Sequence, residues 1–469
     1  MIKHKAKNDK KHIAVIGAGW AGCAAAVTLC QQGHQVTLIE ASRTLGGRAR
    51  AVEVDGRLVD NGQHILLGAY SACLELMRLL RIDLKEALLR LPLQMVYPHQ
   101  TGIQFIAPKL PAPLHVLFAL MSAKGLSGAD KMALARFSTT ARWIDWRLHQ
   151  DCTVAELLER YEQTENLCRY MWNPLCIAAL NTPPERASAQ VFLNVLRDSL
   201  GAKRAASDML IPRLDLSRLL PDAAAEFIRQ HGGQVITGVS IQSLKQQDNQ
   251  SWRLESLRTK LAPTTAIEAD PITNQQFDGI VIATSAKQAQ RLLSAATIDS
   301  TNQSRSDTTQ ASLTNLEFVY EPISTCYLQY AESLKLDRPF YALADDPQQK
   351  HWAQFIFDRG QLNPAQTGLM AVVISASTAA SSHATSQVIA DICRQLAQQL
   401  QNAAFATPIW TQVITEKRAT FACTPNLKRP ANQTEIPGIT LAGDFTASDY
   451  PATLESAVRS GIEAAKAWI

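Results

Sequence analysis

The sequence predicts an α/β protein whose main sheet is assembled from segments far apart along the chain, and three patterns support this. The first is a strand, glycine turn and helix that begins at residue 13. The second is a buried apolar strand at 277–284, and the third is a strand at 438–444 followed by a small-residue helix at 454–468. Strands that alternate with helices in this way are typical of a doubly wound parallel sheet. The predicted core is therefore a discontinuous Rossmann-like domain.

The N-terminal segment 13–22 (IAVIGAGWAG) ends an apolar strand in three glycines. Gly17 permits the tight turn out of the strand, Gly19 lets the backbone approach a pyrophosphate, and Gly22 allows the helix to pack closely on the strand. The amides at the start of the helix favour the same phosphates. Glu40 ends the next strand, and its carboxylate is expected to accept hydrogen bonds from a ribose. Together these elements predict a dinucleotide clamp rather than an ordinary glycine-rich turn.

A second glycine-rich loop follows this unit. Gly46 and Gly47 precede Arg48, which suits a loop that passes close to a phosphate and offers it a charged donor. The turn 60–64 (DNGQH) comes next. Its position shortly after Arg48 predicts that this turn lies near the same ligand.

Composition excludes several classes of protein. A length of 469 residues indicates about two to four domains. Lysine and arginine total 46 against 42 acidic residues, so there is no electrostatic argument for nucleic acid, although the basic tail 1–12 could touch an anionic membrane. Nine cysteines without a CxxC pair indicate reduced thiols, a cytoplasmic setting and no metal site. No apolar run reaches the length of a transmembrane helix, and no signal peptide cleavage is expected.

The pattern along the chain divides the nucleotide-binding domain into three parts. Between them we expect a helical region with apolar periodicity near 72–80, 154–161 and 191–200, and a smaller sheet with strands near 325–330, 355–357 and 369–375. A helix at 219–230 and a turn and strand at 232–241 return the chain to the first domain. The predicted segments are 1–75, 206–295 and 421–469 for the nucleotide-binding domain, 76–205 for the helical substrate or cap region, 296–312 for a polar linker, and 313–420 for the substrate-domain sheet.

Residues 105–121 (FIAPKLPAPLHVLFALM) are apolar, interrupted by proline and almost uncharged. Such a segment fits a surface that dips into lipid or lines a hydrophobic channel. A buried loop and helix in the core is the alternative interpretation.

The order of these parts resembles the superfamily of FAD-dependent amine oxidases and phytoene desaturases over essentially the whole chain. Three strings look like those of the hydroxysqualene dehydroxylases, the squalene-associated desaturases of hopanoid biosynthesis: DNGQHILLGAY (60–70), NPLCIAALNTPPERASA (173–189) and GDFTASDYPATLESAVRSG (443–461). The resemblance implies non-covalently bound FAD in a domain of the glutathione reductase type (GR2). It also implies an interleaved α+β substrate domain and a helical cap.

The resemblance implies a role for each matching residue. The glycine turn would hold the pyrophosphate, Arg48 would lie near the phosphates or the ribityl chain, Val239 would contact adenine, and Asp444 would accept from a ribityl hydroxyl. The start of the last helix would face the flavin ring, where a helix N-terminus stabilises negative charge. The complete predicted cofactor set is Gly17, Ala18, Gly19, Trp20, Ala21, Gly22, Glu40, Ala41, Gly46, Gly47, Arg48, Gly62, Gln63, Val239, Gly443, Asp444, Pro451, Ala452, Thr453 and Leu454.

The activity that the resemblance implies is reductive. Reduced FAD would deliver hydride from N5 to the allylic carbinol carbon of hydroxysqualene, and the hydroxyl would leave as water to give squalene. His64 is the candidate proton donor because it sits in the DNGQH turn, although a lone histidine is more often structural. Weaker candidates for the donor are Asp449, Tyr450 and Glu455. Candidates for lining an apolar tunnel are Tyr70, Trp172 and Phe445, for which core packing is the alternative.

Other functions fit parts of the same pattern. A carotenoid-type desaturase acting on phytoene or dehydrosqualene is the nearest, followed by an amine oxidase and a non-catalytic prenyl-lipid carrier. The expected partners are a triterpene substrate, squalene-synthase-like enzymes and the inner face of the cytoplasmic membrane. A second GxGxxG motif is absent from the sequence, so the electron donor stays open.

Overall fold

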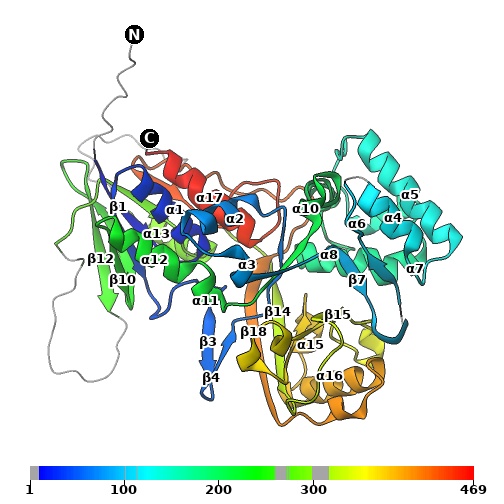
Figure 1. The fold of residues 1–469 in the computed structure, drawn as a ribbon. Coiled ribbons are helices and arrows are strands. Elements are labelled where there is room, and N and C mark those ends of the chain that lie inside the picture. The colour runs from blue at the N-terminus through cyan, green and yellow to red at the C-terminus, as the bar shows by residue number, and fades with distance from the viewer. Residues whose placement is uncertain are drawn as a thin grey trace.

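The structure is a computed structural model that describes residues 10–100, 102–111, 114–258, 272, 274–297 and 316–468. Its main sheet has five parallel strands (Figure 1). In spatial order they are β10 (Gln234–Thr237), β2 (Gln35–Glu40), β1 (His12–Ile16), β13 (Gly279–Ile282) and β19 (Ile439–Leu441). When these five strands are numbered by their order along the chain, their spatial order is 3-2-1-4-5. This is the doubly wound topology. The predicted α/β fold is confirmed.

Alternating residues of β1 build two separate cores on the two faces of this sheet. Ile13 and Val15 pack on one side against α1, α12 and α17, while Ala14 and Ile16 pack on the other against a β-hairpin and α13. This period of two is what a strand buried on both faces requires. The elements are α1 (Trp20–Gln31), α12 (Pro221–Gln230) and α17 (Leu454–Lys466), the hairpin β11 (Val239–Gln246) and β12 (Trp252–Arg258), and α13 (Ala286–Ser294).

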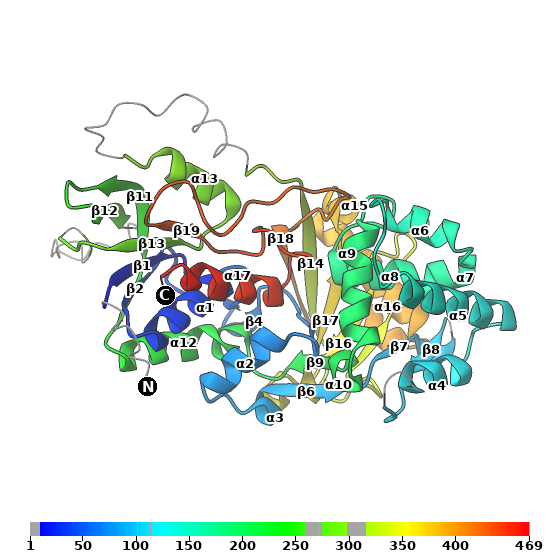
Figure 2. The same ribbon diagram turned by 90° about the horizontal axis from the view of Figure 1, so that it is seen from above.

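The first and last helices touch through glycine. A Cβ on Gly461 of α17 would overlap the carbonyl oxygen of Ala21 in α1, and a Cβ on Gly22 would overlap the carbonyl oxygen of Gly17. Figure 2 shows α1 and α17 lying together beside the sheet. The N-terminal glycine turn is therefore held in place by the C-terminal helix.

A second sheet of five antiparallel strands lies below the first domain in Figure 1, with the hairpin of β3 (Ala51–Val54) and β4 (Arg57–Asp60) reaching toward it. In spatial order its strands are β15 (Phe340–Ala342), β16 (Phe355–Asp358), β17 (Leu369–Ile374), β14 (Tyr320–Gln329) and β18 (Trp410–Phe421). The helix α16 (Thr385–Gln399) packs on one face, after the short α15 (Thr378–Ser381). Three of these strands match the predicted ones, whereas β15 and β18 were not predicted.

The region 76–205 is less helical than predicted. It contains three short strands, β6 (Leu88–Leu91), β7 (Gln94–Val96) and β8 (Gln104–Ile106). β6 pairs with β9 (Met209–Pro212), which also pairs with β5 (Leu66–Leu67), so the partners are far away in sequence. Strands this short carry too few residues for a periodic signal, and pairing with distant partners stabilises them.

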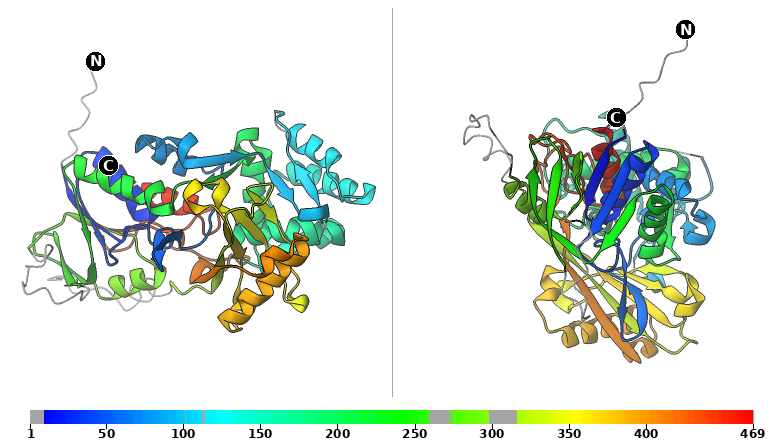
Figure 3. Two further views of the ribbon diagram at one scale, coloured as in Figure 1. Left: turned by 60° about the horizontal axis from the view of Figure 1, so that its bottom comes forward. Right: turned by 90° about the vertical axis from the view of Figure 1, so that its left-hand side faces the viewer.

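Six of the helices described in this region cover the far end of the molecule, on the right of Figures 1 and 2 and of the left view of Figure 3. They are α4 (Leu114–Ser122), α5 (Gly128–Trp143), α6 (Val154–Arg160), α7 (Glu165–Leu167), α8 (Asn173–Leu180) and α9 (Ala189–Leu196). The helices α2 (Ser71–Leu79) and α11 (Leu216–Leu219) instead contact α17 and α12 of the first domain, and the short helices α3 (Leu84–Ala87) and α10 (Arg204–Ser207) complete the set. One-turn π-helices at 168–172 and 197–201 lie beside α8 and α9.

The predicted strand at 232–241 is two strands in two different sheets. β10 joins the parallel sheet and β11 joins the hairpin, because Gly238 between them adopts a positive φ of 74° that turns the chain. The tail 1–9 and residues 298–312 of the predicted linker lie outside the described residues. Among the residues that are described, no helix is long and apolar enough to cross a membrane.

We predict that Gly461→Ala destabilises the protein by about 3 kcal/mol, because the new methyl group would push α17 away from α1. The measurement is thermal unfolding. Gly128→Ala is the matched control, since a Cβ at Gly128 meets no atom within 4 Å. Equal melting temperatures for the two variants would contradict the close contact of these helices.

Candidate active site

A cavity of about 1550 Å³ runs from the carboxyl edge of the parallel sheet to the second sheet and the helical region. Ligands of open α/β sheets bind at this edge, where the strand order reverses. The volume exceeds the roughly 300–1,000 Å³ of ordinary ligand pockets, so it can hold a large cofactor and a substrate together.

The sheet end of the cavity is walled by backbone. Gly17 turns with a φ of +102°, and a Cβ there would lie 2.6 Å from the carbonyl oxygen of Ala283. The amide of Gly46 donates to the carbonyl of Ala18 at 2.8 Å, which ties the second glycine loop to the first. A Cβ on Gly19 would meet only Gly47, at 4.0 Å, so backbone rather than side chains faces the cavity here. This cradle fits a pyrophosphate at the N-terminus of α1.

Most of the predicted cofactor residues line this cavity, but Ala18 and Gly22 do not. Both lie behind the wall, where they support the turn. Trp20 fits the glycine turn because its indole is 3% exposed and donates to the carbonyl of Ala49 at 3.2 Å.

Glu40 has a role that its sequence position did not reveal. One carboxylate oxygen accepts from the amide of Ala18 at 2.8 Å and the other from the amide of Ser42 at 2.9 Å. The carboxylate therefore braces the glycine turn. A carboxylate has about four acceptor sites, so it retains capacity for a ribose hydroxyl.

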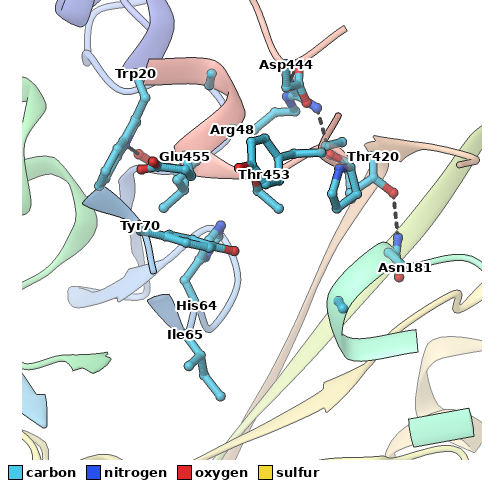
Figure 4. A pocket seen from close by; sticks show the side chains of 18 of the residues that line it. Trp20, Arg48, His64, Ile65, Tyr70, Asn181, Thr420, Asp444, Thr453 and Glu455 are labelled. Carbon is cyan, nitrogen blue, oxygen red and sulfur yellow. Dashed lines mark hydrogen bonds and ion pairs between the residues drawn. The ribbon is translucent and has the colours of Figure 1, made fainter. Parts of the chain in front are cut away.

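Arg48 and Asp444, which were expected to contact the cofactor separately, form an ion pair with an N–O distance of 2.6 Å (Figure 4). Arg48 also donates to the carbonyl of Ala419 at 2.7 Å, so it joins the second glycine loop to the end of β18. Burial lowers the pKa of Arg48, but the Asp444 carboxylate outweighs it, and the net shift is upward. The Arg48 guanidinium therefore stays charged beside the cavity.

The start of α17 opens into the same space. Pro451, Ala452, Thr453 and Leu454 all line the cavity. Thr453 caps the helix, since its hydroxyl accepts from the amide of Ser456 at 3.1 Å. The positive end of the helix dipole therefore faces the cavity and favours negative charge there.

His64 lines the cavity with its Nδ1 2.9 Å from the carbonyl oxygen of Gly62. Burial lowers the pKa of His64; the Gly62 carbonyl raises it less, and the Arg48 charge lowers it further. The imidazole is therefore neutral at pH 7, with Nδ1–H donated to Gly62 and Nε2 available as an acceptor. This arrangement favours a hydrogen-bond acceptor over the predicted proton donor.

Tyr70 extends into the same part of the cavity as His64 (Figure 4). Burial raises the pKa of its hydroxyl, and the charge of Glu455 raises it as well. The phenol stays protonated, so it can donate a hydrogen bond to a ligand.

Two of the three weaker candidates for a proton donor already have structural partners, and the third lies outside the cavity. Glu455 accepts from the amides of Ala72 and Cys73, both at 3.0 Å, so it caps α2 rather than its own helix. The hydroxyl of Tyr450 donates to Asp198. Asp449 is exposed and does not line the cavity.

Beyond these polar groups the cavity becomes an apolar arm. Phe355, Phe357 and Val373 enter it from the face of the second sheet opposite α16, and Trp172 is nine-tenths or more buried at its wall. Phe445 also lines the cavity, while its ring packs on Gly443. Further apolar lining residues come from β7, β8 and the residue before it, α4, α5 and α8: Met95, Ile103, Phe105, Val116, Leu120, Leu134 and Leu175.

The sequence pattern of the family described as flavin containing amine oxidoreductases matches residues 20–469. The chain belongs to this family. It is 26% identical to the hydroxysqualene dehydroxylase of Rhodopseudomonas palustris and 24% identical to the zeta-carotene desaturase of Synechocystis, over 97% of this chain in both cases and 97% and 96% of those proteins. A triple mutant of putrescine oxidase has the same fold, with a TM-score of 0.67 at 13% identity over 98% of both chains.

FAD is the cofactor of this flavin enzyme, as predicted, and the cavity fits it. The side-chain-free cradle suits the pyrophosphate, Glu40 suits the ribose, and the start of α17 suits the electron-rich end of a flavin ring. Because FAD has an adenosine at one end and a flavin ring at the other, it needs a long cavity such as this one.

We predict that Glu40→Ala raises the dissociation constant for FAD about tenfold or more, because both the brace of the turn and the ribose acceptor are lost. Titration of apoprotein with FAD, followed by flavin fluorescence, measures the effect. Glu53→Ala in the exposed hairpin is the control and should bind FAD like the parent. Equal affinities in the two variants would exclude the assigned role.

Proposed function

We propose that the protein removes the hydroxyl of hydroxysqualene to give squalene. The observation that carries this proposal is the form of the cavity, in which an apolar arm meets the cofactor end at a small polar group made by His64 and Tyr70. A C30 chain with one hydroxyl has the same distribution of polarity. Similarity to a hydroxysqualene dehydroxylase over nearly the full length supports the proposal.

The side chains at the polar group would bind the substrate hydroxyl from two sides. The neutral His64 Nε2 would accept a hydrogen bond from the substrate hydroxyl, which keeps its hydrogen, and the Tyr70 hydroxyl would donate a hydrogen bond to the oxygen. Bound in its reduced form, FAD supplies the hydride for the carbinol carbon. Tyr70 would supply the proton, so that the hydroxyl leaves as water and the carbon gains one hydrogen. Phe355, Phe357 and Trp172 would exclude water from the hydrocarbon part of the substrate.

A polyene desaturase is the second candidate, because a zeta-carotene desaturase is nearly as similar over the same length. A polyene has no hydroxyl and would leave His64 and Tyr70 without a ligand partner. A substrate hydroxyl would pair with Nε2 of His64, whose Nδ1 is bonded to Gly62, and a polyene would not, which is why the dehydroxylase is preferred.

The decisive experiment incubates photoreduced enzyme with hydroxysqualene under anaerobic conditions and identifies the products. We expect squalene in the parent protein and about a hundredfold lower rate in Tyr70→Phe, since the proton donor is lost while FAD binding is retained. The hydroxysqualene control without enzyme should not react. Oxidation of phytoene or dehydrosqualene by the oxidised enzyme, with no reaction of hydroxysqualene, would support the desaturase instead.

Contact with the cytoplasmic face of a membrane is part of the proposal. Within the apolar segment 105–121, α4 has an inner and an outer side. Val116 and Leu120 line the cavity, as expected of a hydrophobic channel. Leu117, Phe118 and Met121 are between 46% and 61% exposed, as expected of a surface that contacts lipid. Residues 112 and 113 lie outside the described chain. A helix that is apolar on its outer side, next to an apolar cavity, suits extraction of a triterpene from lipid.

We predict that replacing Leu117, Phe118 and Met121 together by serine lowers binding to anionic phospholipid vesicles about tenfold, because the outer face of α4 becomes polar. Vesicle flotation measures the bound fraction. Serine at Leu257, Val319 and Ile409, which are 63% to 73% exposed elsewhere on the molecule, is the matched control. If the two triple variants float equally well, α4 is not the contact.

A further inference from the structure

A pair of buried charges lies beside the turn that carries His64. Asp60 ends β4 and Arg359 follows β16, and they are 4% and 3% exposed with a closest N–O distance of 4.0 Å. Arg359 also donates two hydrogen bonds to glutamine side chains. Its Nη1 donates to the side-chain oxygen of Gln63 and its Nε to that of Gln366, both at 2.9 Å.

The same turn is attached to β14 of the second sheet. The amide of Gln63 donates to the hydroxyl of Thr325 at 3.2 Å, and the hydroxyl of Tyr327 donates to the carbonyl of Asp60 at 2.9 Å. Gln63 in turn donates from Nε2 to the carbonyl of His64 at 3.0 Å. Hydrogen bonds therefore run without interruption from Arg359 through Gln63 to His64.

We propose that Arg359 is a positioning residue, which holds His64 in place through Gln63 although it does not itself line the cavity. The inference deepens the proposed function, because His64 is the acceptor for the substrate hydroxyl. The second sheet thus determines the orientation of a side chain that belongs to the nucleotide-binding half of the chain. Gln63 contacts the Thr325 hydroxyl, the His64 carbonyl and Arg359, so its amide transmits orientation rather than a proton.

The burial of this pair is costly, which is a reason to expect a functional role. Burial raises the pKa of Asp60 to about 6, although Arg359 and the amide of Leu216 lower it. A buried ion pair with an N–O distance of 4.0 Å gains little net stability. Two hydrophobic residues in place of Asp60 and Arg359 would stabilise the contact between β4 and the second sheet as well. They would, however, leave the side-chain oxygen of Gln63 without its donor.

The test compares Arg359→Met, Arg359→Lys and Arg394→Met in the FAD-loaded enzyme. Arg394 is the matched control because it pairs at 2.8 Å with the fully buried Asp391 on α16, on the outer side of the same sheet. The primary measurement is the titration of the His64 imidazole by NMR on protein labelled in its histidines. The His64 signal is assigned by its loss in His64→Ala.

We expect Arg359→Met to retain FAD and to raise the pKa of His64 by about one unit, because the turn loosens and water reaches the imidazole. The rate constant kcat for hydroxysqualene should fall about tenfold with little change in KM. Arg359→Lys should recover part of both effects, and Arg394→Met should change neither.

An unchanged His64 titration in Arg359→Met would overturn the inference. If that single variant fails to fold because Asp60 is left unpaired, Asp60→Asn with Arg359→Met removes both charges and gives the same comparison. The titration does not depend on the substrate. A shifted pKa in protein that does not convert hydroxysqualene would therefore retain the positioning role and contradict the proposed function.

Discussion

Close backbone contact at glycine is the constraint on which the rest of the structure depends. The turn after β1 touches the end of β13 at Gly17, α1 touches that turn at Gly22, and α17 touches α1 at Gly461. None of these contacts leaves room for a methyl group. They fix the C-terminal helix directly beside the N-terminal turn, and thereby bring the start of α17 to the cavity that the turn closes at its other end.

The cavity combines two environments that stabilise different parts of the bound molecules. Its sheet end consists of backbone amides, an acid and an ion pair, which suit phosphates and hydroxyls. Its far end consists of aromatic and aliphatic side chains from the second sheet and the helical region. The DNGQH turn lies where they meet and is held from both sides. Asn61 donates to the carbonyl of Arg48 at 3.0 Å on one side, and Arg359 donates to Gln63 at 2.9 Å on the other.

The parallel sheet and the cofactor cradle were predictable because their signals are local. The strand, the glycine turn and Glu40 fall within one continuous unit, and each has a role that its residue type dictates. What could not be predicted depends on distant partners. β6 is a strand because it pairs with β9. Glu455 caps α2 from more than 380 positions further along the sequence. Arg48 and Asp444 form their ion pair although most of the chain lies between them in sequence. Arg359 has no motif around it, so only the strand-like apolar run at 355–357 predicted a sheet nearby.

The order of strands in the parallel sheet has a consequence for biosynthesis. β1 and the glycine turn are synthesised well before β13, β19 and α17, which complete the wall around the cofactor. One edge of β1 therefore stays uncovered until β13 has been made. The wall of the coenzyme site is complete only after α17 has been synthesised, so a nascent chain that stops before residue 454 lacks the helix start that faces the cavity.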